Sequence, residues 1–294
     1  MGEAGNKFHL WLNLGNIKPN AERLIYCSQK TYSENSLFIL CNFREDRLVF
    51  WHAVPVPITS DCIVVLSSKG DIIKKVHIYD LIKDYIPFSC IADVYGSILE
   101  PVNLMRIFYN KLTKGFACAG TGIGTSDLMH TNSIEIMDKN ITSFCKKYDW
   151  LISVSELDLV IIVDAEKEAC LWSWGPGELQ KQHHPTLLKN GNLLIFDNGT
   201  ERGFSRIVEL DPLNKKIVWE YISEPPEKFF SAIRGACQRL PNGNTLVTES
   251  DKGHVFEISK DGKIVWEFYN PNTRERNKER EAIYRMLRIA DFEK

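Results

Sequence analysis

Apolar and polar positions alternate in short runs along this chain, and the clearest set of runs is QHHPTLLKNGNLLIFDNGTERGFSRIVELDPLNKKIVWEY, residues 182–221. The turn at Asn190 and Gly191 separates its first two runs, and Pro212 and Asn214 lie in the turn between its last two. Asn-Gly between apolar segments is typical of a β-hairpin, because both residues tolerate a positive φ. The pattern predicts one sheet of four antiparallel strands. A single sheet would leave apolar surface in water, so it must stack on other sheets.

The same unit recurs along the chain with a constant period. Its last strand carries a tryptophan, and Trp172, Trp219 and Trp266 follow one another at a spacing of 47 residues. A fainter copy in residues 67–76 has Lys74 in the tryptophan position, four periods of 48 residues before Trp266. A four-stranded repeat of roughly 40 to 50 residues is typical of a β-propeller. We expect the repeated tryptophans to fill the gaps between neighbouring blades.

The period also predicts the size of the fold. A chain of 294 residues has room for six four-stranded blades of about 47 residues in a single domain. We expect a degenerate blade in residues 79–115, between the copies that carry Lys74 and Trp172, and a loop or loosely attached strand in residues 1–22. A last apolar run, residues 283–289, predicts a terminal strand that completes the blade begun by the N-terminus and closes the propeller.

Composition narrows the possible functions. The formal net charge of -2 gives no basic footprint for nucleic acid, and no apolar run is long enough to predict a membrane span. The N-terminus shows no signal-peptide pattern, which favours the cytoplasm, or the periplasm or cell exterior if an export signal has been removed. The eight cysteines are widely spaced, without a CxxC pair or a nearby histidine cluster. This spacing favours buried thiols over disulfides or a metal site, and we expect neither a metal nor a cofactor.

Several motifs in the second half of the chain follow one another in a characteristic order. DLMHTNSIE precedes QHHPTLLKNGNLLIFDNG, FSRIVELD, IVWEY, LPNGNTLV and a final Tyr-Arg run, within residues 126–289. This order resembles the bacterial arylsulfotransferase family, whose members are six-bladed propellers. The resemblance implies transfer of a sulfuryl group from an aryl sulfate to a phenol, without a nucleotide sulfate donor. It also implies that a histidine carries the group covalently between the two substrates.

The resemblance assigns roles to particular residues of this chain. His130 and His183 match two family histidines, and Arg206 matches the family arginine that holds the sulfate. The nucleophilic histidine of the family aligns with Ile283. An isoleucine cannot accept a sulfuryl group, so covalent transfer would need another nucleophile, and His130 or His183 is the candidate.

Histidine and arginine side chains suit sulfuryl transfer even without the family resemblance. A guanidinium group offers forked donors to a tetrahedral oxyanion, and a histidine donates a hydrogen bond or moves a proton near neutral pH. In a propeller, His130 and His183 would lie at the start of innermost strands, whose side chains converge on the axis. We therefore expect a small aromatic or anionic ligand there. Three further residues are expected to bind the substrate: Asn132, Tyr284 and Arg285.

Each assignment has a structural alternative. His130 could brace a turn through its polar neighbours, and Arg206 could form an ion pair at the edge of a blade. His183 and His184 point in opposite directions if the strand is extended. We expect His183 to face the axis and His184 to lie at the surface or between blades. Three other histidines have no polar cluster nearby in the sequence and are expected to be structural: His52, His77 and His254.

Two functional hypotheses from different classes stay open. The first is an arylsulfotransferase-like enzyme that acts at the propeller axis. The second is a catalytically silent propeller that binds a small anion or a protein partner. The periodic tryptophans also suggest a quinoprotein dehydrogenase, but the chain has no adjacent cysteine pair. A phosphate loop at Gly120 is not supported, because the glycine spacing does not fit GxGxxG.

Overall fold

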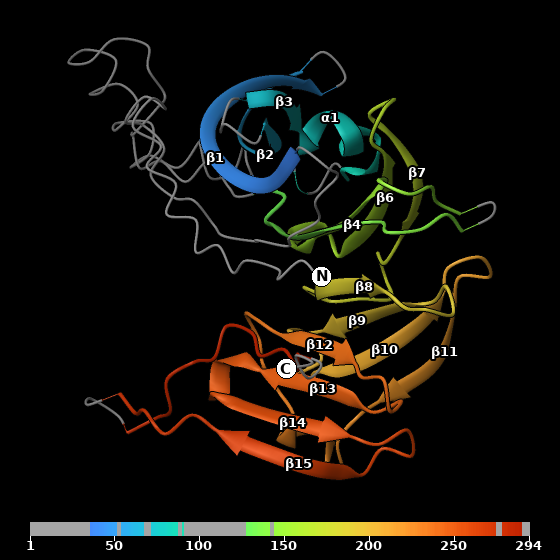
Figure 1. Ribbon diagram of the computed structural model, residues 1–294. Helices are drawn as coiled ribbons and strands as arrows, with labels where there is room; N and C mark the ends of the chain where they lie inside the picture. The colour runs from blue at the N-terminus through green and yellow to red at the C-terminus, as the bar shows by residue number, and fades with distance from the viewer. Residues whose placement is uncertain are drawn as a thin grey trace.

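The computed structural model of this chain describes residues 36–51, 54–67, 72–87, 90, 128–141, 144–274 and 278–289. The predicted segment 1–22 and residues 91–115 lie outside the described residues. Figure 1 shows four sheets that follow one another around an arc, from the sheet of β1 to the sheet of β15. The prediction of an all-β fold with propeller-like blades is confirmed, and the total of six blades stays a prediction.

Fifteen strands are described, together with one short α-helix and four 3₁₀ turns. The first sheet has three strands and each of the others has four, always antiparallel and in chain order. The strands are β1 (Ser36–Trp51), β2 (Val54–Ser67), β3 (Ile72–His77), β4 (Thr131–Ile136), β5 (Trp150–Val154), β6 (Leu159–Asp164), β7 (Ala169–Trp174), β8 (His183–Leu187), β9 (Leu193–Asp197), β10 (Arg206–Asp211), β11 (Lys216–Tyr221), β12 (Ala236–Arg239), β13 (Thr245–Glu249), β14 (His254–Ile258) and β15 (Ile264–Tyr269). The helical elements are α1 (Ile78–Ile82), η1 (Lys83–Tyr85), η2 (Ser155–Leu157), η3 (Pro226–Lys228) and η4 (Ser250–Lys252).

The strand registers confirm the sequence repeat. Trp172, Trp219 and Trp266 lie opposite Ile162, Glu209 and Glu257 of the preceding strands, and in each sheet the register shifts at the next pair. Lys74 lies opposite Val65, with the same shift after it. Lys74 therefore occupies the tryptophan position that the spacing predicted.

Apolar residues from neighbouring sheets form a core at each junction. One cluster joins the first two sheets, a second joins the next pair, and a third joins the last two. The indole N–H of Trp172 donates to the Pro212 carbonyl of the next sheet at 3.0 Å, and that of Trp219 donates to Lys260 at 3.2 Å. The predicted packing of tryptophans between blades is confirmed at these two junctions.

A buried carboxylate accompanies the tryptophan at the junction of the last two sheets. Glu209 accepts hydrogen bonds from the side chains of Asn190 and Asn192 at 3.0 and 2.7 Å. Arg239, on the first strand of the next sheet, pairs with Glu209 at 2.8 Å and stacks over Trp219 at 5.0 Å. The NGN turn, the glutamate and the tryptophan of one sheet thus form a seat for an arginine of the next.

The same seat recurs on the last sheet, where the C-terminal segment fills it. Asn242 and Asn244 donate to Glu257, and Arg288 pairs with Glu257 and lies over Trp266. Arg288 therefore has the position of an arginine on the first strand of a next blade. Residues 283–289 nevertheless form no strand in the described part of the chain, because Met286 and Arg288 donate their N–H groups to side chains of β13 and β12, and Ile283 donates to the Ser250 carbonyl of η4. The predicted terminal strand is in this respect wrong.

The sheets on either side of α1 are direct neighbours. Lys74 donates to the Ala165 carbonyl at 2.7 Å and pairs with Glu168 at 2.9 Å, and both partners lie in the turn between β6 and β7. A complete blade between these sheets would separate the atoms that touch here. The sheets that carry Lys74 and Trp172 are therefore adjacent, and most of residues 79–115, where the degenerate blade was expected, lie outside the described residues.

None of the described helices is long and apolar enough to cross a membrane. The five cysteines whose side chains are described are free thiols: Cys62, Cys90, Cys145, Cys170 and Cys237.

Candidate functional site

The first strands of the blades lie side by side, since β8 contacts both β4 and β12. Each of β4 and β8 carries a bulge near its start, at Asn132 and between His183 and Thr186. His130 and His184 have positive φ values of 42° and 51°. Bulges and left-handed residues re-aim side chains that would alternate in a regular strand. The two histidine motifs therefore lie where the backbone departs from regular geometry.

The ring of His183 is oriented by two acceptors on the same nitrogen. Its Nδ1 lies 2.8 Å from Asn198 Oδ1 and 3.0 Å from the Lys181 carbonyl. The Asn198 amide nitrogen donates to the carbonyls of Ser231 and Arg234, so the oxygen of this amide faces the histidine. Two acceptors at Nδ1 place the ring proton there and leave the lone pair on Nε2.

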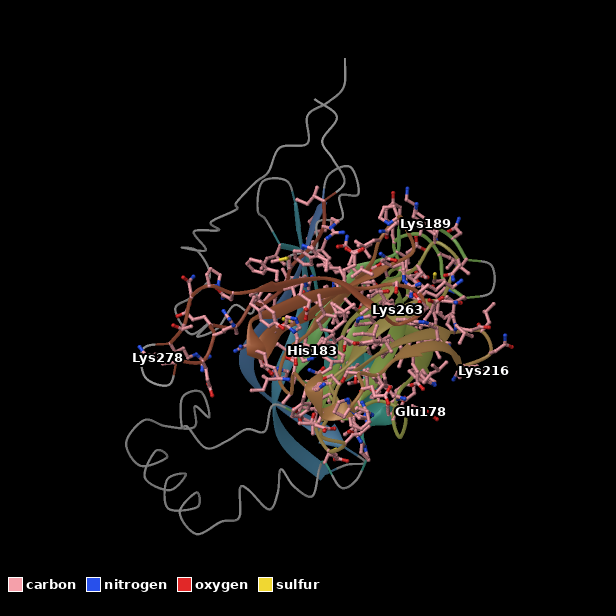
Figure 2. All side chains as sticks on the ribbon, turned by 90° about the horizontal axis from the view of Figure 1, so that it is seen from below. Glu178, His183, Lys189, Lys216, Lys263 and Lys278 are labelled. Carbon is pink, nitrogen blue, oxygen red and sulfur yellow. The ribbon has the colours of Figure 1, made fainter. Side chains whose placement is uncertain are left out.

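His183 is neutral at pH 7. Burial is the main cause that lowers the pKa of His183 from 6.5 to about 4, and the charge of His130 acts in the same direction. His130 thus lies near enough to His183 for its charge to act on that ring. Figure 2 shows His183 near the middle of the described sheets, whereas Lys189, Lys216 and Lys278 lie toward the outside in this view.

Asn132 links the two histidine-bearing strands. Its amide nitrogen donates to the carbonyl of Gln182, the residue before His183, at 2.7 Å. Among the described residues, three buried polar atoms near these bulges have no hydrogen-bond partner: Thr131 Oγ1, Ser133 Oγ and Gln182 Oε1. Buried polar atoms are normally satisfied by protein, water or ligand, so this region suits a polar ligand.

The charge of Arg285 acts on residues of three first strands: Glu135 of β4, His184 of β8 and Cys237 of β12. Tyr284, in contrast, is exposed, with its ring near the Arg285 guanidinium. Arg285 therefore brings a cation to the place where the blades converge.

Glu135 is a site residue that the sequence analysis missed. Its Oε1 accepts the backbone N–H of Leu187 at 3.2 Å, and burial raises the pKa of Glu135 to about 7. In the sequence, Glu135 could have been noticed as a single carboxylate inside the apolar run TNSIEI, directly after the first histidine motif.

His184 lies between blades, one of the two positions expected for it. The ring is buried, and its Nδ1 lies 3.1 Å from the Cys237 carbonyl of β12. Burial lowers the pKa of His184 to about 3. His184 is therefore a neutral packing residue at the junction of two sheets.

Arg206 lies in the ion-pair network of its own sheet. Its Nε pairs with Asp197 at 2.8 Å, its Nη1 with Glu220 at 3.1 Å, and its Nη2 donates to the Glu178 carbonyl. Asp197 is the cross-strand neighbour of Arg206 and also binds Arg202. All three guanidinium nitrogens are thus engaged, which is the geometry of the blade-edge alternative.

Ile283 packs against the last sheet. Its side chain contacts the apolar cluster of Leu240, Leu246 and Val255, together with Met286. The position aligned with the family nucleophile is thus part of the contact that holds the C-terminal segment in place. In the described part of the chain, no group of three or more histidine, cysteine, aspartate or glutamate side chains could hold a metal ion.

We predict that the unfolding free energy contributed by His183 falls as the pH falls from about 6.5 to about 4. In this window the unfolded histidine binds a proton and the folded one does not, so acid favours the unfolded state. Urea unfolding of the protein and of His183→Gln across this range measures the effect, because other groups such as Glu135 cancel in the difference. Parallel stability curves for the two proteins would contradict the prediction.

A family model described as Arylsulfotransferase (ASST) matches residues 109–271, which is more than half of the chain. No curated protein matches the chain.

Among solved structures, the chain is similar to virginiamycin B lyase from Staphylococcus aureus, with 11% identity and a TM-score of 0.43 over 82% of this chain and 54% of that one. It is also similar to a protein of unknown function from Bacteroides caccae, with 14% identity and a TM-score of 0.41 over 71% of this chain and 54% of that one. A third similar structure is the Dos1 propeller, with 10% identity and a TM-score of 0.38 over 80% of this chain and 48% of that one. The chain spans about half the length of each of these proteins.

Proposed function

This chain belongs to the arylsulfotransferase family, and from that membership we propose that it transfers a sulfuryl group from an aryl sulfate to a phenolic acceptor. The reaction takes place where β4 and β8 begin and where His130 and His183 meet. The substrate is a small aromatic anion.

The observation that carries this proposal is the orientation of His183. Asn198 and the Lys181 carbonyl hold the ring proton on Nδ1, and the low pKa keeps the ring neutral at pH 7. A neutral imidazole with a fixed lone pair is a nucleophile that needs no further activation. His183 therefore takes the role that Ile283 cannot fill.

The proposed transfer has two steps. The Nε2 lone pair of His183 attacks the sulfur atom, an N–S bond forms, and the ester S–O bond breaks as the phenolate leaves with its electron pair. The acceptor phenol then loses its proton to solvent or to His130. Its oxygen attacks the same sulfur atom, the N–S bond breaks, and neutral His183 is restored.

Arg285 is the candidate cation for the sulfuryl oxygens. Its charge already acts on residues of three first strands, and a guanidinium group suits a tetrahedral oxyanion. Asn132 acts indirectly, since it holds the Gln182 carbonyl next to His183. Arg206 holds Asp197, whose other oxygen accepts the Gln180 N–H near the start of β8.

The second candidate function is a silent propeller that binds a small anion. The specific observation in its favour is Ile283, a hydrocarbon side chain packed against its own sheet at the position aligned with the family nucleophile. In this case His130, His183 and Arg285 bind the anion, and no bond to sulfur forms.

A chromogenic aryl sulfate offered with a set of phenols separates the two functions. We expect acceptor-dependent release of the coloured phenolate from this aryl sulfate, ping-pong kinetics and a sulfuryl adduct on the peptide that contains His183. The control is the same mixture without an acceptor, which reports hydrolysis alone. Absence of turnover over a broad set of donors would contradict the enzyme, and calorimetric binding of the aryl sulfate in that case would support the silent binder.

A further inference from the structure

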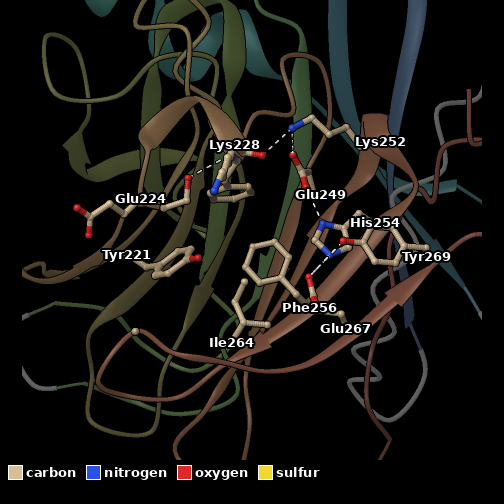
Figure 3. A pocket seen from close by; sticks show the side chains of 13 residues that line it. Tyr221, Glu224, Lys228, Glu249, Lys252, His254, Phe256, Ile264, Glu267 and Tyr269 are labelled. Atoms are coloured by element: carbon tan, nitrogen blue, oxygen red, sulfur yellow. Dashed lines mark hydrogen bonds and ion pairs between the residues drawn. The ribbon is translucent and has the colours of Figure 1, made fainter.

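A pocket lies away from the axial histidines, between the outer strands of the last two sheets. Its volume is about 580 Å³, and Tyr221 of β11 and Phe256 of β14 line it next to each other, with ring centroids 6.0 Å apart (Figure 3). β11 ends where β8 begins, because two antiparallel strands separate them. The pocket runs along the outermost strands, because residues from both ends of β15 line it, Ile264 and Tyr269.

A histidine held by two carboxylates forms one wall of this pocket. His254 Nδ1 lies 2.8 Å from Glu249 and Nε2 lies 3.1 Å from Glu267. The ring stacks on Tyr269 with a centroid distance of 4.3 Å and an interplanar angle of 7°. His254 was expected to be structural, and its partners come from β13, five residues before it, and from β15, thirteen residues after it. The clamp fixes Glu267 and gives the pocket a rigid polar wall.

The charges that line the pocket leave one carboxylate for a ligand. Glu249 is fully engaged, by Lys252 at 2.6 Å, His254 and the Phe230 N–H. At the exposed rim, the negative charge of Glu224 cancels the positive charge of Lys228 in the net charge of the lining. Glu267 uses Oε1 for His254 and for the Tyr269 hydroxyl. Within the described part of the chain its Oε2 has no hydrogen-bond partner, and its side chain is 43% exposed.

The Tyr221 hydroxyl is the second group available to a ligand. Among the described residues it has no hydrogen-bond partner, although the residue as a whole is buried. Burial and then the charges of Glu249 and Glu267 raise the pKa of Tyr221, so the hydroxyl stays neutral in a negative field. The remaining wall is apolar and includes Phe256 and Ile264. A carboxylate, a hydroxyl and aromatic walls attract an ammonium ion.

We propose that this pocket binds a small organic ammonium ion with an apolar or aromatic body. The Glu267 carboxylate and the Tyr221 hydroxyl accept hydrogen bonds from the ammonium group, while Phe256 and Ile264 contact the body. The proposal is independent of sulfuryl transfer, because no residue of the axial site lines this pocket.

Three probes of similar shape test this proposal on the full chain: 2-phenylethylammonium, 2-phenylethanol and 3-phenylpropionate. We expect calorimetry to show that the ammonium ion binds at least about tenfold more tightly than the other two, as a charge-assisted hydrogen bond would give. Glu267→Gln removes this preference, whereas Glu227→Gln, at an exposed carboxylate outside the pocket, keeps it. Equal affinities, no binding, or a preference that survives Glu267→Gln would overturn the proposal.

Two further variants keep the test decisive. Tyr221→Phe keeps the ring and removes the hydroxyl, so it weakens ammonium binding severalfold even if Glu267→Gln does not fold, and an unchanged affinity in Tyr221→Phe refutes the proposed contact. His183→Ala leaves ammonium binding unchanged. Loss of ammonium binding in His183→Ala would place the ligand at the axis and overturn the assignment to this pocket.

Discussion

Replacing His183 by alanine abolishes sulfuryl transfer, with a loss of at least about 10³-fold in kcat, as expected when a covalent nucleophile is removed. The physical reason is the ring geometry: Nδ1 faces Asn198 and the Lys181 carbonyl, so only Nε2 carries a lone pair. Acceptor-dependent release of phenolate from a chromogenic aryl sulfate measures the loss. The variant must also show no sulfuryl adduct on the peptide around residue 183.

The control for this result is the neighbouring His184→Gln. That side chain is buried against the Cys237 carbonyl, so its replacement changes stability more than transfer. Transfer that persists in His183→Ala would show that the nucleophile is another residue, even if the family assignment holds.

Replacing Phe229 by alanine destabilises the protein by about 3–5 kcal/mol, the usual cost of removing a fully buried phenylalanine. Phe229 is 2% exposed, and its ring meets Phe196 and Phe256 edge to face at 5.5 and 5.3 Å. These rings belong to different sheets, and Tyr221 completes the contact. The variant thus opens a cavity between two blades, and urea unfolding followed by tryptophan fluorescence measures the cost.

Leu213→Ala is the matched control for Phe229→Ala. Leu213 lies in the turn between β10 and β11 and is 58% exposed, so its replacement changes the unfolding free energy by less than about 0.5 kcal/mol. A similar small change in Phe229→Ala would mean that the two sheets do not depend on this aromatic contact.

The architecture was predictable because its signal is periodic. The spacing of Trp172, Trp219 and Trp266 reports the same register in three sheets, and it placed Lys74 correctly even without an aromatic ring. The spacing could not show that the sheets of Lys74 and Trp172 are neighbours. The chain between two repeats has the same length whether or not the two repeats are neighbours, and the contact of Lys74 with Ala165 shows that these two are neighbours.

The candidate site was predictable only where a motif placed residues at the start of first strands. His130 and His183 belong to such motifs and lie close enough to influence each other. Arg206 starts a third strand, and its partner Asp197 stands at the end of the strand before it. An aspartate directly before a hairpin loop and an arginine directly after it could have indicated this pair. Glu135 and Arg285 are 150 residues apart in the sequence, so no local pattern joins them.

The seat for an arginine on each of the last two sheets has a consequence for cooperativity. Glu209 receives Arg239 from the next sheet, and Glu257 receives Arg288 in the same way. Each of these carboxylates is almost fully buried, and a buried carboxylate that loses its partner is costly. A sheet that unfolds therefore leaves a buried carboxylate without its arginine in the neighbouring sheet. The loss of one sheet thus destabilises the next, as in a one-dimensional array of coupled repeats.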